Sequence, residues 1–515
     1  MFAIESTVSI VLPPMLQTRH PLWLIALLAL AFDSTAGEVT LGPLFHQFGL
    51  ALDSGTRAEA AGPLFYYERR DSAKIWAVPP AVSYTVDEET DFAEFDLLYP
   101  VVTLNRFGPE YRFQMFQLLA FAGGQSLTET NVNRFTLFPI YFHQWSDIPE
   151  KNYWALVPIY GHLRDRLFRD EIRFVLWPLY SRTRKGGVIT DNFPYPFLHS
   201  RRGPGLRGWQ FWPLIGREHK ELTRKTNLWD EVQVAGGHDR LFVLWPFYLK
   251  QTSGIGTTNV IKQEALLPAY SQYRSPRRDS TTFLWPVGIT HTVDREKKYN
   301  EWGAPWPLIV FTRGEGKYTS RIWPFFSEAY TLSAGERAGV RELTSRWYLW
   351  PLYKHNAIRS DPLDRQRTRI LFYLYSDISE KNTETGAEAW RRDLWPLFTA
   401  RQDWQGHRSL QLLSILEPIL PNNKSIERNY SPLWALWRSQ RNGKTGAASQ
   451  SLLWNLYRRD RGPATVADPQ GAKKTSLLFG LFQHHSSSDG SRWRLFYIPF
   501  GGKNVQIPDG EVASD

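Results

Sequence analysis

The sequence predicts an all-β protein, built as a long antiparallel meander of repeated units of about 20 residues. Three observations support this: a recurring Leu-Trp-Pro-Leu core, an aromatic share of 15% with only 3 Met, and turn residues between the cores. Aromatic residues favour pleated strands over helices. Short links rich in Gly and Asn join antiparallel neighbours, so the chain should fold as a succession of hairpins.

The repeated core is clearest in the run from Phe174 to Tyr180, where Trp177 and Pro178 are followed by Leu179. Eight of the 22 Trp directly precede a Pro, whereas chance would give roughly one or two, so the chain is a repeat protein. Further copies of the core surround Pro139, Pro158, Pro213, Pro246, Pro286, Pro324, Pro351 and Pro396.

Each unit has one apolar run and one turn region, which predicts one strand per unit and about 22–24 strands in all. With proline at the centre of a strand, both faces of the sheet would be apolar at half height. Proline cannot donate to a strand ladder and is normally kept to edges or bulges. The alternative is that the proline marks a strand end, and that each unit holds two shorter strands.

Two architectures would cover both faces of such a meander. The first, which we favour, is a large closed barrel in the outer membrane, because closure removes the exposed edge strands. The second is a soluble rolled β-repeat array or a propeller-like ring. The short apolar run counts against a simple barrel, since about five to eight residues span only ~17–26 Å before any tilt.

The N-terminal region predicts export. An uncharged apolar run at 22–32 follows Arg19 and precedes Ser34-Thr35-Ala36. This is the pattern of a secretory signal peptide, which we assign to residues 1–36, with Met15 as an alternative start. The rest, 37–515, is expected to form a single β-repeat domain.

No catalytic motif is present, and the protein is predicted not to be an enzyme. The sequence has no nucleophile elbow, no zinc-protease helix and no phosphate-binding glycine loop. It has no Cys, and its 12 His are scattered. We therefore expect no catalytic residue, no cofactor and no bound metal.

One segment, 416–434, interrupts the repeat with a dense polar cluster. Its members are Glu417, Asn423, Glu427, Arg428 and Asn429. These side chains could hydrogen-bond to one another on an otherwise apolar face, which makes them the candidate binding site. The alternative is a long capped loop near the end of the array.

The net charge of +10 comes largely from Arg residues placed just after the apolar runs, and their first explanation is that they solvate strand ends and turns. The alternative is that they bind an anionic partner. Candidates for that partner are outer-membrane lipid, lipopolysaccharide or an acidic glycan, and nothing indicates nucleic acid.

The Leu-Trp-Pro-Leu cores, together with the runs at 426–434 and 451–457, resemble uncharacterised exported repeat proteins of Gram-negative bacteria. This resemblance implies a cell-envelope protein and no particular activity. We therefore expect a non-enzymatic outer-membrane barrel with a structural or amphiphile-transport role. The alternative is a soluble or peripheral protein of the periplasm or cell surface that binds anionic glycan or lipid.

Overall fold

The computed structural model describes residues 44–125, 131–226, 232–332, 340–466, 468–469, 471–488 and 490–500. The segment 1–36, for which a signal peptide is predicted, lies outside these residues. Within them, one antiparallel sheet of 43 strands runs from β1 to β45, and β20 and β21 form a separate hairpin. This confirms the predicted all-β antiparallel meander.

The first third of the meander runs from β1 to β15. Its strands are β1 (Phe45–Gly49), β2 (Gly55–Ala60), β3 (Phe65–Arg70), β4 (Ala73–Val78), β5 (Val82–Asp87), β6 (Phe92–Leu97), β7 (Val102–Phe107), β8 (Glu110–Met115), β9 (Leu119–Gly123), β10 (Val132–Leu137), β11 (Tyr141–Ser146), β12 (Tyr153–Leu156), β13 (Tyr160–Arg166), β14 (Arg169–Val175) and β15 (Tyr180–Lys185).

The middle third contains the separate hairpin. Its strands are β16 (Val188–Asn192), β17 (Leu198–Gly203), β18 (Leu206–Phe211), β19 (Ile215–Lys220), β20 (Thr223–Thr226), β21 (Val232–Ala235), β22 (Gly237–Val243), β23 (Tyr248–Ile255), β24 (Ile261–Leu266), β25 (Tyr270–Arg274), β26 (Arg278–Phe283), β27 (Ile289–Asp294), β28 (Tyr299–Gly303), β29 (Ile309–Gly314) and β30 (Lys317–Ile322).

The last third includes the only α-helices of the described residues. Its strands are β31 (Phe326–Leu332), β32 (Val340–Tyr348), β33 (Tyr353–Ser360), β34 (Leu363–Ile370), β35 (Tyr375–Asn382), β36 (Glu388–Leu394), β37 (Phe398–Gln402), β38 (Arg408–Leu412), β39 (Trp437–Arg441), β40 (Ala448–Leu452), β41 (Tyr457–Arg461), β42 (Lys473–Leu477), β43 (Phe482–Ser487), β44 (Gly490–Leu495) and β45 (Ile498–Phe500). The helices are α2 (Lys424–Asn429) and α3 (Ser431–Trp434), and single 3-10 turns are η2 (Gly62–Leu64), η3 (Pro149–Lys151) and η4 (Leu478–Gly480).

The strand number is about twice the predicted 22–24, because each repeat unit holds two strands. The prediction placed the Trp-Pro core in the middle of a strand, and the structure places it in the turn between two. Trp177 and Pro178, for example, connect β14 to β15, and Trp350 and Pro351 connect β32 to β33. The alternative, that the proline marks a strand end, is therefore correct, and it leaves the missing proline N–H outside the ladder.

The two rims of this wall differ in chemistry. In a meander consecutive turns alternate between the two rims, so all turns that follow even-numbered strands lie on the same one. These turns carry the Leu-Trp-Pro-Leu cores, and we call this side the aromatic rim. The turns after odd-numbered strands form the polar rim, with Gly186-Gly187, Pro204-Gly205 and 295–298 as examples.

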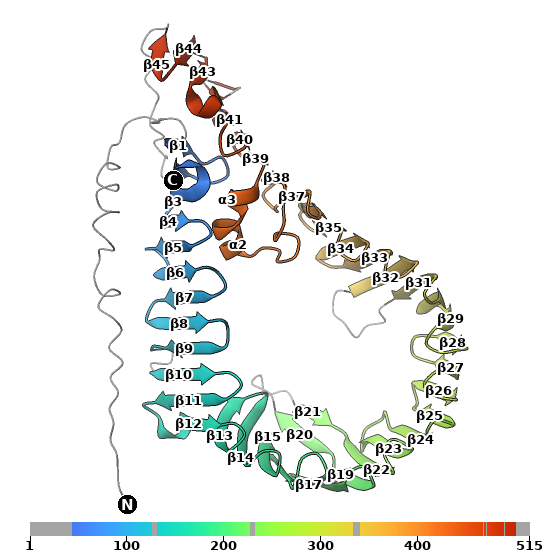
Figure 1. The fold of residues 1–515 in the computed structure, drawn as a ribbon. Helices are drawn as coiled ribbons and strands as arrows, with labels where there is room; N and C mark the ends of the chain where they lie inside the picture. The colour runs from blue at the N-terminus through green and yellow to red at the C-terminus, as the bar shows by residue number, and fades with distance from the viewer. Residues whose placement is uncertain are drawn as a thin grey trace, which may run out of the picture.

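The predicted barrel closure does not occur. Within the described residues β1 pairs only with β2, and β45 pairs only with β44. The wall nevertheless bends round on itself, which brings β37–β41 next to β1–β5, while the last strands continue past this junction (Figure 1). Side-chain contacts, described below, take the place of strand pairing where the two ends meet.

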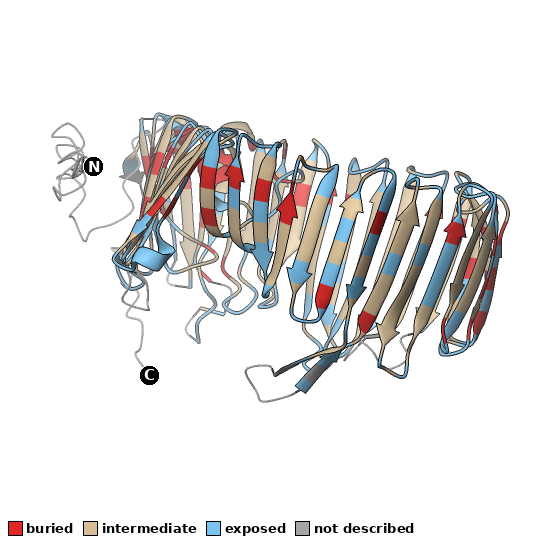
Figure 2. Cartoon of the chain, turned by 90° about the horizontal axis from the view of Figure 1, so that it is seen from below, coloured by how far each residue is buried: buried red, intermediate tan, exposed pale blue. Residues whose placement is uncertain are grey.

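The wall is a single layer, so its buried interior is small and largely polar. Figure 2 shows the strands crossing from one rim to the other with few buried positions on each. One apolar cluster contains Tyr153, Leu163 and Phe174. Elsewhere charged side chains meet across neighbouring strands: Asp191 on β16 accepts hydrogen bonds from Arg182 on β15 and Arg202 on β17, at 2.5 and 2.9 Å. Such cross-strand pairs stabilise a sheet that has no second layer.

Candidate functional site

The two ends of the wall meet around α2 and α3, which replace the turn between β38 and β39. Asn423 caps α2, because its side-chain oxygen accepts a hydrogen bond from the Ile426 N–H at 3.0 Å. Pro432 lies in the first turn of α3, where its missing N–H costs nothing. At six residues α2 is too short to be stable alone. Its position therefore depends on what it packs against, which we call the seam: α2 and α3 between β1–β6 and β37–β41 (Figure 1).

Arg428 is the central residue of the seam. Its guanidinium donates to Ser83 Oγ at 2.8 Å and to Thr85 Oγ1 at 2.8 Å, both on β5. It also forms ion pairs with Glu94, at 3.0 Å, and with Asp96, both on β6. Burial alone would lower the pKa of Arg428, but these two carboxylates outweigh it and raise the pKa above its usual value. One side chain from near the C-terminal end of the wall is thus held by two strands near the N-terminal end.

Neighbouring side chains extend this contact. The Tyr66 hydroxyl on β3 donates to the Arg428 carbonyl at 2.9 Å. Asn429 Nδ2 donates to Asp96 at 3.0 Å, and Asn423 Nδ2 donates to the Tyr99 hydroxyl at 2.9 Å. Asn429 and Asp96 are both fully buried. Most polar groups of the seam therefore pair with one another, although Asp96 Oδ1, Asn429 Oδ1 and Glu417 Oε2 are buried without a hydrogen-bond partner among the described residues.

Glu417 and Glu427 hold the helices to their own end of the wall. Glu417 accepts hydrogen bonds from Gln411 Nε2 at 2.7 Å, Trp434 Nε1 at 3.1 Å and the Ser431 hydroxyl. Glu427 accepts from Arg401 Nη1 at 2.6 Å. These contacts fix the helices on β37 and β38, so α2 is fastened on both sides.

A second row of contacts joins the first two strands to β39–β41. Asn455 Nδ2 donates to Glu59 at 2.6 Å, and Asn442 Nδ2 donates to the Leu52 carbonyl at 2.9 Å. The Arg458 guanidinium stacks on the Phe48 ring, 3.3 Å from its centroid. Burial lowers the pKa of nearby His46 to about 4, with Arg458 adding to the effect. Side chains and backbone of β1, β2 and the turn between them therefore contact β41 and the turns around β39–β41.

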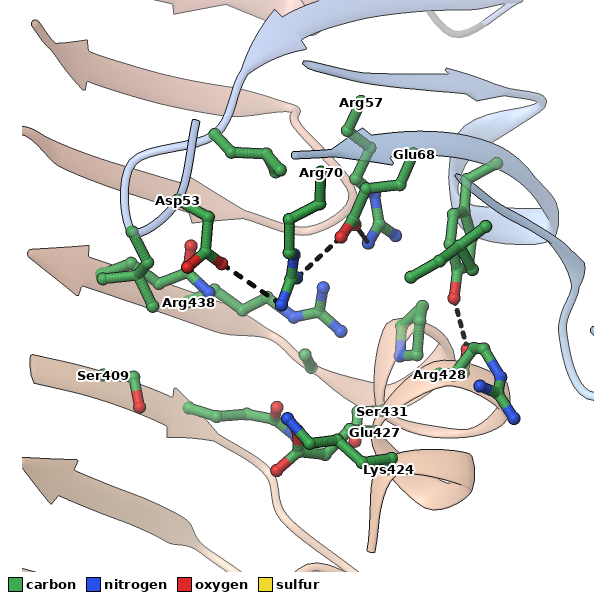
Figure 3. A pocket seen from close by; sticks show the side chains of 18 of the residues that line it. Asp53, Arg57, Glu68, Arg70, Ser409, Lys424, Glu427, Arg428, Ser431 and Arg438 are labelled. Atoms are coloured by element: carbon green, nitrogen blue, oxygen red, sulfur yellow. Dashed lines mark hydrogen bonds and ion pairs between the residues drawn. The ribbon is translucent and has the colours of Figure 1, made fainter. Parts of the chain in front are cut away.

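Between these contacts lies a pocket of about 650 Å³, lined from both ends of the wall. Arg57, Arg70 and Arg438 extend into it, with Glu68 between the first two (Figure 3). Glu68 pairs with Arg57 at 3.1 Å and with Arg70 at 2.7 Å. Burial lowers the pKa of Arg438 to about 10, and the positive charge of Arg57 contributes. Burial likewise raises the pKa of the Tyr66 hydroxyl to about 12.

All five predicted site residues lie in the seam. Asn423, Arg428 and Asn429 reach across to β5, β6 and the following turn, whereas Glu417 and Glu427 bind residues of their own end. Their role as a ligand site stays a prediction. Sequence reasoning missed their partners. Ser83, Thr85, Glu94 and Asp96 alternate along two strands and so share one face of the sheet. The alternation of polar residues along these two strands is a signal in the sequence that could have identified them as partners.

The described residues also bear on metal binding and on membrane-spanning helices. They include no group of three or more His, Asp or Glu that could hold a metal ion. No helix among them is long and apolar enough to cross a membrane. Comparison with known protein families finds no match to this chain, and comparison with curated proteins finds none either. The resemblance to exported repeat proteins therefore stays an expectation.

Proposed function

We propose that this protein is an exported, non-enzymatic ring of the cell envelope that lies on a membrane and inserts its aromatic rim into one lipid leaflet. The observation that carries the proposal is the separation of apolar turns on one rim from polar turns on the other. This favours the peripheral, lipid-binding role that the sequence offered as its second choice over a barrel that spans the membrane.

The aromatic rim presents large apolar side chains to solvent along most of its length. Its exposed members include Leu98, Phe116, Leu118, Phe138, Ile140, Ile159, Leu176, Trp177, Leu179, Phe193, Tyr195, Phe197, Leu214, Leu244, Trp245, Phe247, Leu284, Trp285, Val287, Trp323, Phe325, Leu349, Trp350, Leu352, Leu371, Phe372, Tyr373, Leu374, Trp395, Leu397, Leu436, Leu453, Trp454, Leu478 and Phe496. A continuous exposed apolar surface of this size marks an interaction site.

The aromatic side chains of this rim contact one another from turn to turn. The ring centroids of Trp212 and Trp245 are 5.9 Å apart, and those of Trp323 and Trp350 are 6.3 Å apart. Trp is also the residue enriched where a protein meets the membrane–water interface. Neighbouring turns therefore form one surface.

The depth of the apolar band fits a single leaflet. At the turn between β14 and β15 the band includes Val175 and Tyr180, and it ends at Ser181 and Arg182. One or two residues on each side of the turn, at about 3.4 Å each, extend roughly 3–7 Å below it, so the band with its turn is at most about 10 Å deep. Interfacial segments bury about 5–10 Å, whereas a spanning strand needs an apolar height of about 25 Å.

The mid-wall chemistry also supports a position on the surface. Arg182, opposite Asp191 near the middle of its strand, is exposed. A charged side chain facing lipid at mid-membrane costs about 2–4 kcal/mol. The net charge of +10 adds attraction to anionic headgroups.

The test is binding of the full chain to vesicles of phosphatidylglycerol and phosphatidylcholine. The triple variant Leu349→Ser, Trp350→Gln, Leu352→Ser removes three exposed side chains of one aromatic turn and should lower partitioning by at least about tenfold. The matched control is Leu167→Ser with Phe168→Ser, an exposed apolar turn on the polar rim. It should bind as the wild type does.

Depth is measured by quenching of Trp fluorescence with brominated lipids. Bromine near the headgroup should quench more strongly than bromine near the chain ends. The proposal would be contradicted if the aromatic-turn variant and the polar-rim control lost binding equally, or if bromine near the chain ends quenched more strongly. A stable dimer formed through the aromatic rims that does not bind vesicles would also contradict it.

A further inference from the structure

We infer that the seam pocket is a binding site for a phosphate group, held by Arg57, Arg70 and Arg438. This goes beyond the proposed function, because the pocket lies between the two ends of the wall and can bind a soluble phosphate without any membrane. The pocket's volume of about 650 Å³ falls in the range of small-molecule sites and exceeds what phosphate alone needs. The chemical class is therefore a phosphate group, either free or carried as an ester on a small polar group.

The first argument is unsatisfied donors. Arg57 Nη2 and Arg70 Nε are buried and have no hydrogen-bond partner within the part of the chain that the structure describes. The Arg438 guanidinium likewise donates no hydrogen bond and forms no ion pair among the described residues. Buried polar groups in native proteins are nearly always paired, so the two buried open donors, together with the partly buried and unpaired Arg438 guanidinium, call for a ligand.

The second argument is charge. Glu68 is shared between Arg57 and Arg70, and Glu59, which also pairs with Arg57, accepts a hydrogen bond from Asn455. Asp53 also pairs with Arg70, at 3.2 Å, so Arg57 and Arg70 each have carboxylate counter-ions, whereas Arg438 has none within ion-pair distance among the described residues. Arg438 experiences the attraction of Glu59 and Glu417 only at longer range, together with repulsion from Arg57. Arg438 is partly buried, and a partly buried cation without a close counter-ion is costly, so a bound anion would remove that cost.

The third argument is geometry. The three side chains come from β2, β3 and β39, and all extend into the same pocket (Figure 3). Guanidinium groups bind phosphate through paired N–H donors, which a single oxygen acceptor of the protein cannot match. Because β2 and β3 belong to one end of the wall and β39 to the other, a bound phosphate would bridge the two ends.

The experiment is isothermal titration calorimetry of the full chain in phosphate-free buffer. Sodium phosphate is compared with sodium chloride at equal ionic strength. Saturable 1:1 binding of phosphate, absent with chloride, is the expected result, and its absence in the wild type would overturn the inference. Glycerol 3-phosphate and phosphatidylglycerol vesicles then identify the source: tighter binding of the glycerol ester indicates a lipid headgroup, and equal binding indicates a free phosphate.

Arg438→Gln should weaken phosphate binding by about 10-fold to 100-fold, since it removes charge-assisted hydrogen bonds. It should also unfold at the same or a higher temperature than the wild type without phosphate, because it removes an uncompensated charge. Arg438→Lys, which keeps the charge and loses the fork, should be intermediate. The control is Arg441→Gln, exposed on the same strand and on its other face. Equal phosphate affinity in wild type and Arg438→Gln would overturn the inference.

Discussion

Replacing Arg428 by Met should loosen the seam. The Arg428 side chain is 7% exposed, and the Asp96 and Glu94 carboxylates with which it pairs are 0% and 17% exposed. Removing one partner of a buried ion pair costs about 3–5 kcal/mol, because the other charge remains buried and uncompensated. Met keeps an unbranched apolar stem like that of Arg428, so the change is concentrated at the guanidinium.

Hydrogen exchange of the backbone amides of 423–435 measures this effect. With the seam weakened, α2 cannot persist alone. Each 1.36 kcal/mol corresponds to a factor of ten, so protection of these amides should fall by about 100-fold or more. Amides of β28–β30, far from the seam in Figure 1, should keep their protection.

Two further variants test whether the loss of protection comes from breaking the ion pair or from general destabilisation. Arg346→Met removes a surface pair with Glu328, whose side chains are 50% and 44% exposed, and should cost below about 1 kcal/mol. Arg428→Met combined with Asp96→Asn should recover part of the lost protection, because no buried carboxylate remains at position 96. Unchanged protection in Arg428→Met, or no recovery in the double variant, would refute the reasoning.

Three other predictions concern single positions in the wall and in the seam. Asp191→Asn should lower the melting temperature at pH 7: burial alone would raise the pKa of Asp191, but Arg182 and Arg202 outweigh it and hold that pKa below its usual value. The stabilisation that Asp191 provides is complete above its unfolded pKa of about 4 and is lost as the pH falls through its lower folded pKa. The difference in melting temperature between wild type and variant should therefore shrink below about pH 4. Thermal melts that show the same difference at every pH would disprove this. Gly161→Ala should destabilise by about 1–3 kcal/mol, because the new Cβ would lie 2.3 Å from Phe174 and 2.6 Å from Ala155. Gly49→Ala, whose nearest neighbour would be 4.0 Å away, is its control in urea unfolding, and equal losses would count against the packing argument. Tyr66→Phe should cost about 0.5–1.5 kcal/mol by removing the hydrogen bond to Arg428, a loss that should vanish in the Arg428→Met background if the seam is already open.

The sequence was sufficient for the fold class because strand chemistry recurs throughout the chain. It also singled out 416–434, since a dense polar run between apolar cores is visible without a structure. The strand number failed for a physical reason. Half of the turns are apolar and lack the usual turn residues: Leu176 and Leu349 have φ of 47° and 46°, a region where Gly or Asn is expected.

The predicted half-height apolar belt was wrong for the same reason. With Trp177 in a turn, the apolar residues gather on one rim, and the strand middles are left to pairs such as Arg182 with Asp191. The partners of Arg428 were out of reach for a different reason. Asp96 is 332 residues away from Arg428 in the chain, and no local pattern relates positions so far apart.

Because each hairpin pairs only with its neighbours, the girth of this molecule is set by how many hairpins lie between Asp96 and Arg428. Duplication of one hairpin there would lengthen the wall by about 10 Å and leave both sides of the junction unaltered. Natural variants of this architecture should therefore differ in circumference by whole hairpins. Substitutions in β5 and β6 should instead be matched by substitutions in α2.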